Sequence, residues 1–226
     1  MTVKNKDQVN KKIKVFLVDD HAMICDGLAE LINLSNDIIV CGKANDANSA
    51  MNGICQTKPD VAIIDLILKE SSGLLLIKDA VAKIPNLSIL ALSMLDEAIY
   101  AERALQAGAM GYIMKDASGD KILHGIRNLA KGKKYISDEL TERILDKMAG
   151  SQKVKEPSPS RLLTNRELEI FSLTGNGQNS QQISKKLHIS VKTVETHHFN
   201  IKSKLGLTNV NELIKSAVKW VLNESK

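Results

Sequence analysis

The sequence predicts an α/β domain with a five-stranded parallel sheet, followed by a smaller all-α domain that contains a helix-turn-helix. Short apolar runs alternate with stretches of helical spacing from residue 13 to residue 131. Two of these runs, Val61–Ile67 and Ser88–Met94, are almost continuously apolar, which is typical of strands that are buried on both faces of a sheet. Beyond residue 160 the strand-like alternation ends and only helical spacing remains.

Each apolar run in the first domain is short enough for a strand, and each intervening stretch is long enough for the helix that joins two parallel strands. In chain order, the expected strands and helices are Lys14–Val18, Ala22–Leu34, Ile38–Val40, Ala47–Thr57, Val61–Ile67, Gly73–Lys83, Ile89–Met94, Glu97–Gln106, Tyr112–Met114 and Ser118–Lys131.

A further helix is expected at Asp138–Met148, and the segment Gly150–Ser160 is expected to be a linker because it is rich in Gly, Pro and Ser. The last domain divides into four helical pieces, Asn165–Thr174, Gln181–Leu187, Val191–Leu205 and Val210–Leu222. The predicted organisation is therefore a flexible arm at 1–12, an α/β domain at 13–131, a helix and linker at 132–160, and a helical domain at 161–226.

Composition supports two globular domains with different charge. The chain has 226 residues, of which 43% are hydrophobic and 25% charged, and this argues against extensive disorder. Residues 15–130 hold nine Lys and Arg against fifteen Asp and Glu, whereas residues 161–226 hold ten against five. The acidic part is suited to cations and the basic part to a polyanion such as nucleic acid.

Cysteines and hydropathy indicate the compartment. The three cysteines form no CxxC pair, so neither a disulfide framework nor a zinc site is predicted. No stretch approaches 18 consecutive apolar residues, and the first twelve residues are polar. We expect a cytoplasmic protein that does not interact with membranes.

Five polar residues lie at the carboxyl ends of the expected strands, which meet at one edge of a parallel sheet. They are Asp19, Asp20, Asp65, Ser93 and Lys115. Three converging carboxylates repel one another unless a hard cation such as Mg²⁺ lies among them, and a carboxylate can act as a nucleophile toward phosphorus. For any single Asp the alternative is a helix cap, as for Asp20 before Ala22, but five matched residues at the ends of strands favour a phosphoryl-transfer site.

The motifs V-F-L-V-D-D-H at Val15–His21, D-L-I-L-K-E-S-S-G at Asp65–Gly73, L-S-M at Leu92–Met94 and G-A-M-G-Y-I-M-K-D at Gly108–Asp116 resemble the receiver domain of two-component response regulators. The resemblance implies a flavodoxin-like (βα)5 fold. It also implies that Asp65 is the phosphoacceptor and that Asp19, Asp20, Asp65 and the backbone carbonyl of Ile67 bind Mg²⁺. Lys115 would bind the phosphate, and Ser93 and Tyr112 would be the switch residues. A buried core role for Tyr112 is an equally good interpretation.

Two of the helical pieces, Gln181–Leu187 and Val191–Leu205, have the spacing of a helix-turn-helix, with Ser190 as a helix N-cap. At about 100° per residue, Val194, His198, Ile201 and Leu205 point inward, and the opposite face is expected to enter the major groove. The expected DNA contacts are Lys185, Lys192, Thr193, Glu195, Thr196, Phe199, Lys202 and Lys204. A solvated helix face is the alternative for Lys185 and its neighbour Lys186 taken alone.

The stretches Leu163–Phe171, Ile183–His197 and Asn200–Leu207 resemble the LuxR-type DNA-binding domain. Together with a receiver, this domain is similar to the NarL/FixJ family of response regulators. The resemblance implies a sensor histidine kinase as partner, double-stranded promoter DNA as ligand, and a homodimer formed through the last helix.

Three functions are compared. The leading hypothesis is a transcriptional regulator whose DNA binding is switched by phosphorylation of Asp65. It implies no enzyme activity apart from Mg²⁺-dependent self-phosphorylation and autodephosphorylation. An aspartyl-phosphate phosphatase or phosphotransferase is disfavoured because Ile67 occupies the place where such enzymes need a general acid. A constitutive DNA-binding protein with the receiver as dimerisation module is the third hypothesis.

Overall fold

The chain divides into two compact units, Met1–Glu142 and Arg143–Lys226. The computed structural model describes residues 12–68, 72–94, 97–148, 159–187 and 189–224. The predicted N-terminal arm, except for residue 12, and most of the predicted linker lie outside the described residues.

The first unit is built on a five-stranded sheet in which every neighbouring pair of strands is parallel, in the order β2-β1-β3-β4-β5. The strands are β1 (Ile13–Val18), β2 (Ile38–Ala44), β3 (Val61–Asp65), β4 (Ser88–Ser93) and β5 (Gly111–Met114). Every residue of β3 and β4 is buried, as their continuous apolar sequences predicted. The predicted α/β fold with a parallel sheet is confirmed.

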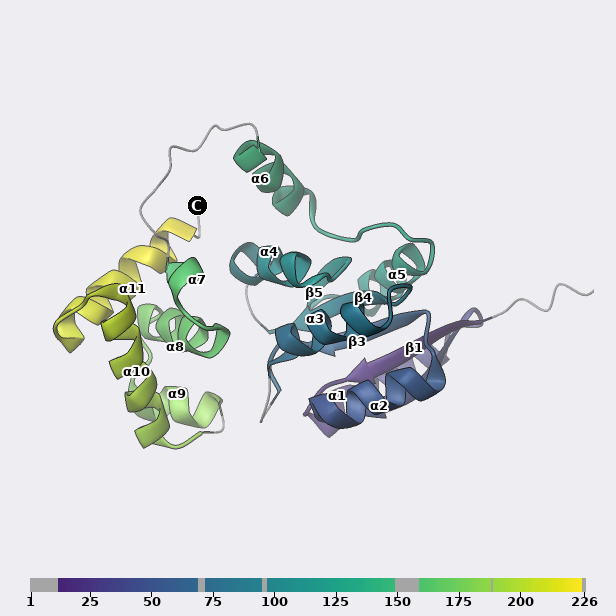
Figure 1. The fold of residues 1–226 in the computed structure, drawn as a ribbon, viewed down its shortest axis with the longest axis horizontal. Coiled ribbons are helices and arrows are strands. Elements are labelled where there is room, and N and C mark those ends of the chain that lie inside the picture. Colours follow the sequence, from purple (N-terminus) through teal and green to yellow (C-terminus); the bar gives the residue numbers. More distant parts are fainter. Residues whose placement is uncertain (1–11, 69–71, 95–96, 149–158, 188, 225–226) are drawn as a thin grey trace, which may run out of the picture. The chain divides into compact units, whose positions relative to one another are not determined.

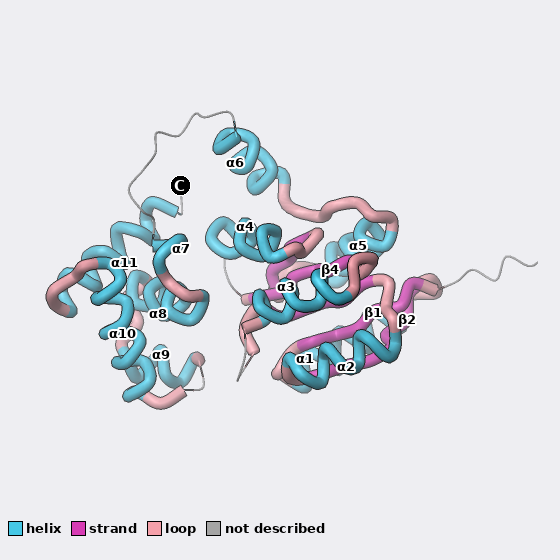
Figure 2. The backbone as a smooth tube through the Cα atoms, viewed as in Figure 1, coloured by secondary structure: helices cyan, strands magenta, loops and turns pink. Residues whose placement is uncertain are grey.

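Helices alternate with the strands and cover both faces of the sheet (Figures 1 and 2). They are α1 (Ala22–Asn33), α2 (Ala47–Thr57), α3 (Gly73–Lys83), α4 (Glu97–Ala107) and α5 (Gly119–Ala130). One core cluster joins α1 and α5 to one face of the sheet through Ile32, Ile126 and Leu129. On the other side, α3 packs beside both α2 and α4. This layering leaves the carboxyl edge of the sheet to the loops that carry the polar strand ends.

Some element boundaries differ from the prediction. Strand β3 ends at Asp65 rather than Ile67, because the chain turns there and Ile67 forms an isolated antiparallel bridge with Ser72. A short helix, α7 (Pro159–Leu162), begins within the segment that was expected to be linker. Its first residue is a proline, which suits the first turn of a helix.

Helix α6 (Asp138–Met148) precedes the predicted linker, and the second unit holds α8 (Asn165–Gly175), α9 (Ser180–Lys186), α10 (Val191–Leu205) and α11 (Val210–Glu224). Side chains cap three of these helices. Thr164 and Glu167 form a capping box at α8, Asn179 and Gln182 form one at α9, and Ser190 caps α10 as predicted. The unit is all-helical over the residues described, and its core includes Leu168, Phe171, Ile183, Val194, Ile201, Leu213 and Trp220.

Candidate functional site

The carboxyl edge of the sheet brings the polar strand ends together. Asp19 follows β1, Asp65 is the last residue of β3, Ser93 is the last residue of β4, and Lys115 follows β5. The backbone N–H of Lys115 donates to the carbonyl oxygen of Ser93 at 2.8 Å, which fixes the ends of the two strands against each other. Parallel strand order therefore places four residues from distant parts of the sequence at one edge.

Lys115 makes two short contacts with the carboxylates. Its Nζ lies 2.5 Å from Asp19 Oδ2 and 2.7 Å from Asp65 Oδ2. The three side chains are only 4–5% exposed, so solvent screens these charges little. Burial alone would lower the pKa of Lys115, but the negative charges of Asp65 and Asp19 outweigh it and raise this pKa. The ammonium group is therefore held in its charged form between two carboxylates.

Asp65 lies in a less favourable environment for its own charge. Its Oδ1 accepts a hydrogen bond from the backbone N–H of Ile67 at 3.1 Å, and its Oδ2 accepts from Lys115. Burial raises the pKa of Asp65 to about 6, although Lys115 opposes this shift. A carboxylate whose charge is poorly solvated gains from any further cation beside it.

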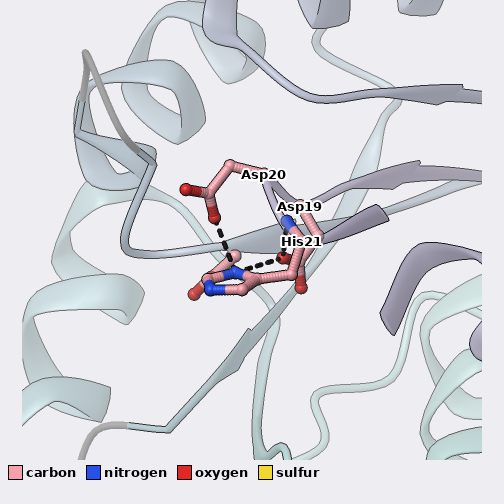
Figure 3. Close-up of side chains that lie close together, drawn as sticks. Asp19, Asp20 and His21 are labelled. Atoms are coloured by element: carbon pink, nitrogen blue, oxygen red, sulfur yellow. Dashed lines mark hydrogen bonds and ion pairs between the residues drawn. The ribbon is translucent and has the colours of Figure 1, made fainter. Parts of the chain in front are cut away.

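His21 also belongs to the acidic cluster, although its place after the acidic pair predicts a residue at the start of a helix rather than a metal ligand. Its ring Nδ1 lies 2.8 Å from Asp20 Oδ1 and 3.2 Å from Asp19 Oδ1, and its backbone N–H donates to Asp19 Oδ1 at 2.9 Å (Figure 3). His21 is the residue before α1, so Asp20 does not take the N-cap position. Adjacency to the acidic pair was the signal in the sequence, but nothing there showed that the ring turns back onto both carboxylates.

The cluster has the donor set of a site for a hard divalent cation. One ligand atom from each of Asp19, Asp20, His21 and Asp65 can be chosen so that all four lie within 4.8 Å of one another. Asp20 Oδ1 is buried and faces the ring Nδ1 of His21 at 2.8 Å. Carboxylate oxygens that converge in this way fit a cation such as Mg²⁺, which binds oxygen ligands and retains several waters. The arrangement is compatible with magnesium binding.

Ser93 and Tyr112 lie on the neighbouring strands β4 and β5 and are both buried, with 0% and 2% exposure. The backbone N–H of Tyr112 donates to the carbonyl oxygen of Tyr135 at 3.0 Å. The buried ring of Tyr112 agrees with a core role in this conformation, which was one of the two interpretations.

A second group of candidate residues lies on the α9–α10 helix pair. Val194 and Ile201 of α10 are fully buried, and His198 is half-buried with its Nε2 3.0 Å from Thr174 Oγ1. Burial lowers the pKa of His198, which favours the neutral ring. The predicted DNA contacts Lys185, Lys192, Thr193, Glu195, Thr196, Phe199 and Lys204 are exposed, and Lys202 is half-buried. The helix therefore presents the predicted face outward.

Two basic residues of this unit are engaged in the domain itself. Lys204 Nζ lies 2.6 Å from Glu167 Oε2, and Glu167 is the buried acid of the α8 capping box. The guanidinium of Arg166 pairs with Glu169 at 2.7 Å and donates to the carbonyl oxygen of Leu187 at 3.0 Å. These contacts join α8 to the helix-turn-helix, so both cations have a structural role besides any contact with a ligand.

Comparison with known proteins covers both units. A family model for the response regulator receiver domain matches residues 15–127, and a model for bacterial regulatory proteins of the luxR family matches residues 161–217. The chain is similar to the oxygen regulatory protein NreC of Staphylococcus aureus, with 35% identity over 216 residues, 94% of this chain and all of NreC.

Solved structures that resemble this chain are also response regulators. The response regulator ChrA of a heme-sensing two-component system is 29% identical, with a TM-score of 0.50, over 92% of this chain and 97% of that one. The response regulator RcsB of Salmonella typhimurium is 25% identical, with a TM-score of 0.54, over 92% and 99%. Among the helices that the structure describes, none is both long and apolar enough to cross a membrane.

Proposed function

The chain belongs to the NarL/FixJ family of two-component response regulators, whose DNA binding depends on phosphorylation, and on this premise we propose that Asp65 is the residue that accepts the phosphoryl group. The observation that carries the proposal is the contact of Asp65 with Lys115 at 2.7 Å beside the acidic cluster. A receiver implies a histidine kinase as donor, and a LuxR-type domain implies DNA as ligand.

In the proposed reaction an oxygen of Asp65 attacks the phosphorus of a phosphohistidine on the kinase. The O–P bond forms as the N–P bond breaks, and the histidine ring leaves as the neutral imidazole after it takes up a proton. Lys115 neutralises charge on the transferred phosphoryl oxygens, since its ammonium already lies between Asp19 and Asp65. Asp19, Asp20, Asp65 and the backbone carbonyl of Ile67 would hold Mg²⁺, which supplies further charge neutralisation.

We also propose that the chain is a substrate for phosphorylation rather than a turnover enzyme. Ile67 lies directly beside the nucleophile and has no proton to donate, so a general acid for rapid hydrolysis is missing at that position. Mg²⁺-dependent self-phosphorylation by a small phosphodonor and slow autodephosphorylation are part of the proposal.

Phosphorylation is proposed to act through Ser93 and Tyr112. The hydroxyl group of Ser93 would move to the phosphoryl oxygens, and the strand pair β4–β5 would transmit this change to Tyr112. Because Tyr112 is buried, any movement of its ring must repack the surface that covers it.

The proposed DNA contacts are seven exposed residues of α9 and α10 and the half-buried Lys202. The seven are Lys185, Lys192, Thr193, Glu195, Thr196, Phe199 and Lys204. A phosphate that approaches Lys204 must compete with Glu167 for its ammonium group. We therefore assign Lys204 a smaller share of the phosphate affinity than Lys192.

A homodimer through α11 is also proposed. An apolar groove on this helix is lined by Ile214, Lys215, Val218, Lys219 and Leu222, and its three aliphatic residues are exposed. RcsB, a structural relative at 25% identity, has been solved as dimers bound to DNA. DNA half-sites related by a two-fold axis would match such a dimer. We also propose a cytoplasmic location.

The test compares the wild type with Asp65→Asn, with Asp79→Asn as matched control because Asp79 is an exposed aspartate on α3. Incubation with acetyl phosphate and Mg²⁺ should add one phosphoryl group to the wild type and the control but none to Asp65→Asn, as measured by intact mass. DNA affinity should rise in the same two proteins. Phosphorylation of Asp65→Asn would refute the site, and DNA binding that ignores phosphorylation would favour a constitutive DNA-binding protein.

A further inference from the structure

Phe199 is an exposed aromatic residue in the middle of the predicted recognition helix. Its side chain is 68% exposed, whereas Val194 and Ile201 on the same helix are fully buried in the domain core. An aromatic ring in water contributes little to folding, and burial against a partner is favourable in proportion to the apolar area removed from water. The position of Phe199 on α10 therefore suggests a contact with the ligand of that helix.

Two threonines precede Phe199 on the exposed part of α10, and their hydroxyl groups have partners within the helix or its cap. Thr196, one turn before it, donates its hydroxyl to the backbone carbonyl of Lys192 at 2.9 Å. Thr193 has its hydroxyl 2.8 Å from that of Ser190, within the N-terminal cap. Both hydroxyl groups are thus engaged inside the helix, and the methyl groups of the two threonines remain for contacts outside it.

The charges around Phe199 indicate where its ring would lie on a duplex. Glu195, four residues before it and one turn away, is exposed and its carboxylate can only accept hydrogen bonds. Neither a carboxylate nor a phenyl ring suits a phosphate, whereas Lys192 at the start of the helix does. The start of the exposed face of α10 is therefore suited to a phosphate, and the part of this face at Phe199 is suited to base edges in the floor of the major groove.

We propose that Phe199 contacts the C5-methyl group of a thymine in each half-site and so contributes to the choice of DNA sequence. The thymine methyl is the apolar group that a base pair presents in the major groove. This inference rests on the proposed DNA-binding role of α10. It assigns to Phe199 a contribution to sequence preference rather than to the general affinity for DNA.

The experiment first selects binding sites from a random duplex pool, using the full chain with acetyl phosphate and Mg²⁺. Each thymine of the enriched site is then replaced by deoxyuridine, which pairs identically and lacks only the methyl group. We expect wild type to lose about fourfold in affinity at one thymine per half-site, the factor that corresponds to about 0.8 kcal/mol for one buried methyl group.

Three variants decide between methyl contact and general affinity. Phe199→Ala should bind the thymine site more weakly and show no further loss on deoxyuridine substitution, while Phe199→Leu should retain part of the sensitivity. Ser203→Ala, an exposed neighbour on α10, should behave as the wild type. Because Phe199 lies outside the core, its removal should leave the fluorescence of Trp220 unchanged.

The outcomes are distinct. Equal losses on deoxyuridine substitution in the wild type and in Phe199→Ala, at every thymine, would overturn this inference and leave the DNA-binding role intact. If no sequence is enriched from the pool by the phosphorylated protein, the proposed function fails and the inference fails with it.

Discussion

Replacement of Lys115 by methionine is expected to destabilise the α/β unit strongly when Mg²⁺ is absent. The ammonium group contacts Asp19 at 2.5 Å and Asp65 at 2.7 Å, and all three side chains are at most 5% exposed. Methionine preserves much of the volume but leaves two buried carboxylates without a cation. Breaking a buried ion pair by removing one partner costs about 3–5 kcal/mol, because the remaining charge is uncompensated.

The protonation of the two carboxyl groups sets an upper limit to the expected loss of folding stability. A carboxyl group with an ordinary pKa near 3.8 can be protonated at pH 7 for about 4 kcal/mol, so each uncompensated carboxylate costs no more than that. Addition of Mg²⁺ should restore stability and should stabilise Lys115→Met more than the wild type, since a ligand that binds only the folded state shifts the equilibrium toward it.

Hydrogen exchange followed by mass spectrometry is the appropriate assay because the chain has two units. Peptides from β1, β3 and β4 should exchange faster in Lys115→Met, while those from α8 and α10 should be unchanged and serve as an internal reference. Lys43→Met is the matched control. Lys43 pairs with Asp26 at 2.6 Å, but the pair is 44% and 66% exposed and screened by solvent, so its removal should leave the exchange rates almost unchanged. Unchanged exchange in β3 without Mg²⁺ would refute the argument.

Three further perturbations test other parts of the structure. Burial alone would raise the pKa of Glu167, but hydrogen bonds from Lys204 and its own cap lower it below the ordinary 4.5, so the helical unit should lose stability as the pH falls below 4.5. Tryptophan fluorescence should report this loss, and Lys204→Met should reduce the pH dependence at a cost of about 1–2 kcal/mol. Gly73→Ala would drive a Cβ into the backbone carbonyl oxygen of Asp65, so it should lower stability by about 1–3 kcal/mol and slow phosphorylation, whereas Gly27→Ala has open space and should do neither. Val218→Glu puts a charge in the groove of α11 and should prevent dimer formation, as measured by sedimentation; an unchanged mass would exclude that interface.

Much of the α/β fold follows from the sequence because its strands are short, apolar and buried on both faces. The expected strand at Val61–Ile67 overran the true end at Asp65, since the apolar residues continue into the turn and hydropathy does not distinguish a strand from the buried turn that follows it. Capping could be predicted at Ser190 because the cap and its partner lie within one helical turn. Local signals therefore predict the type of each element well and the residues at which it begins and ends less well.

The contacts of charged side chains were harder to predict, and the reason is geometric. Lys204 is one of the basic residues around the helix-turn-helix, which made it a candidate for contact with a DNA phosphate, but its partner Glu167 lies 37 residues earlier in the chain. A DNA phosphate is negatively charged like the Glu167 carboxylate. The sequence of α10 alone therefore does not show which of these two groups Lys204 contacts. Lys115 and Asp65 are separated by even more, 50 residues, yet their proximity could be expected because parallel strand order brings strand ends to one edge. A distant pair is predictable when the topology fixes both positions, and the packing of α8 against α10 supplies no comparable rule.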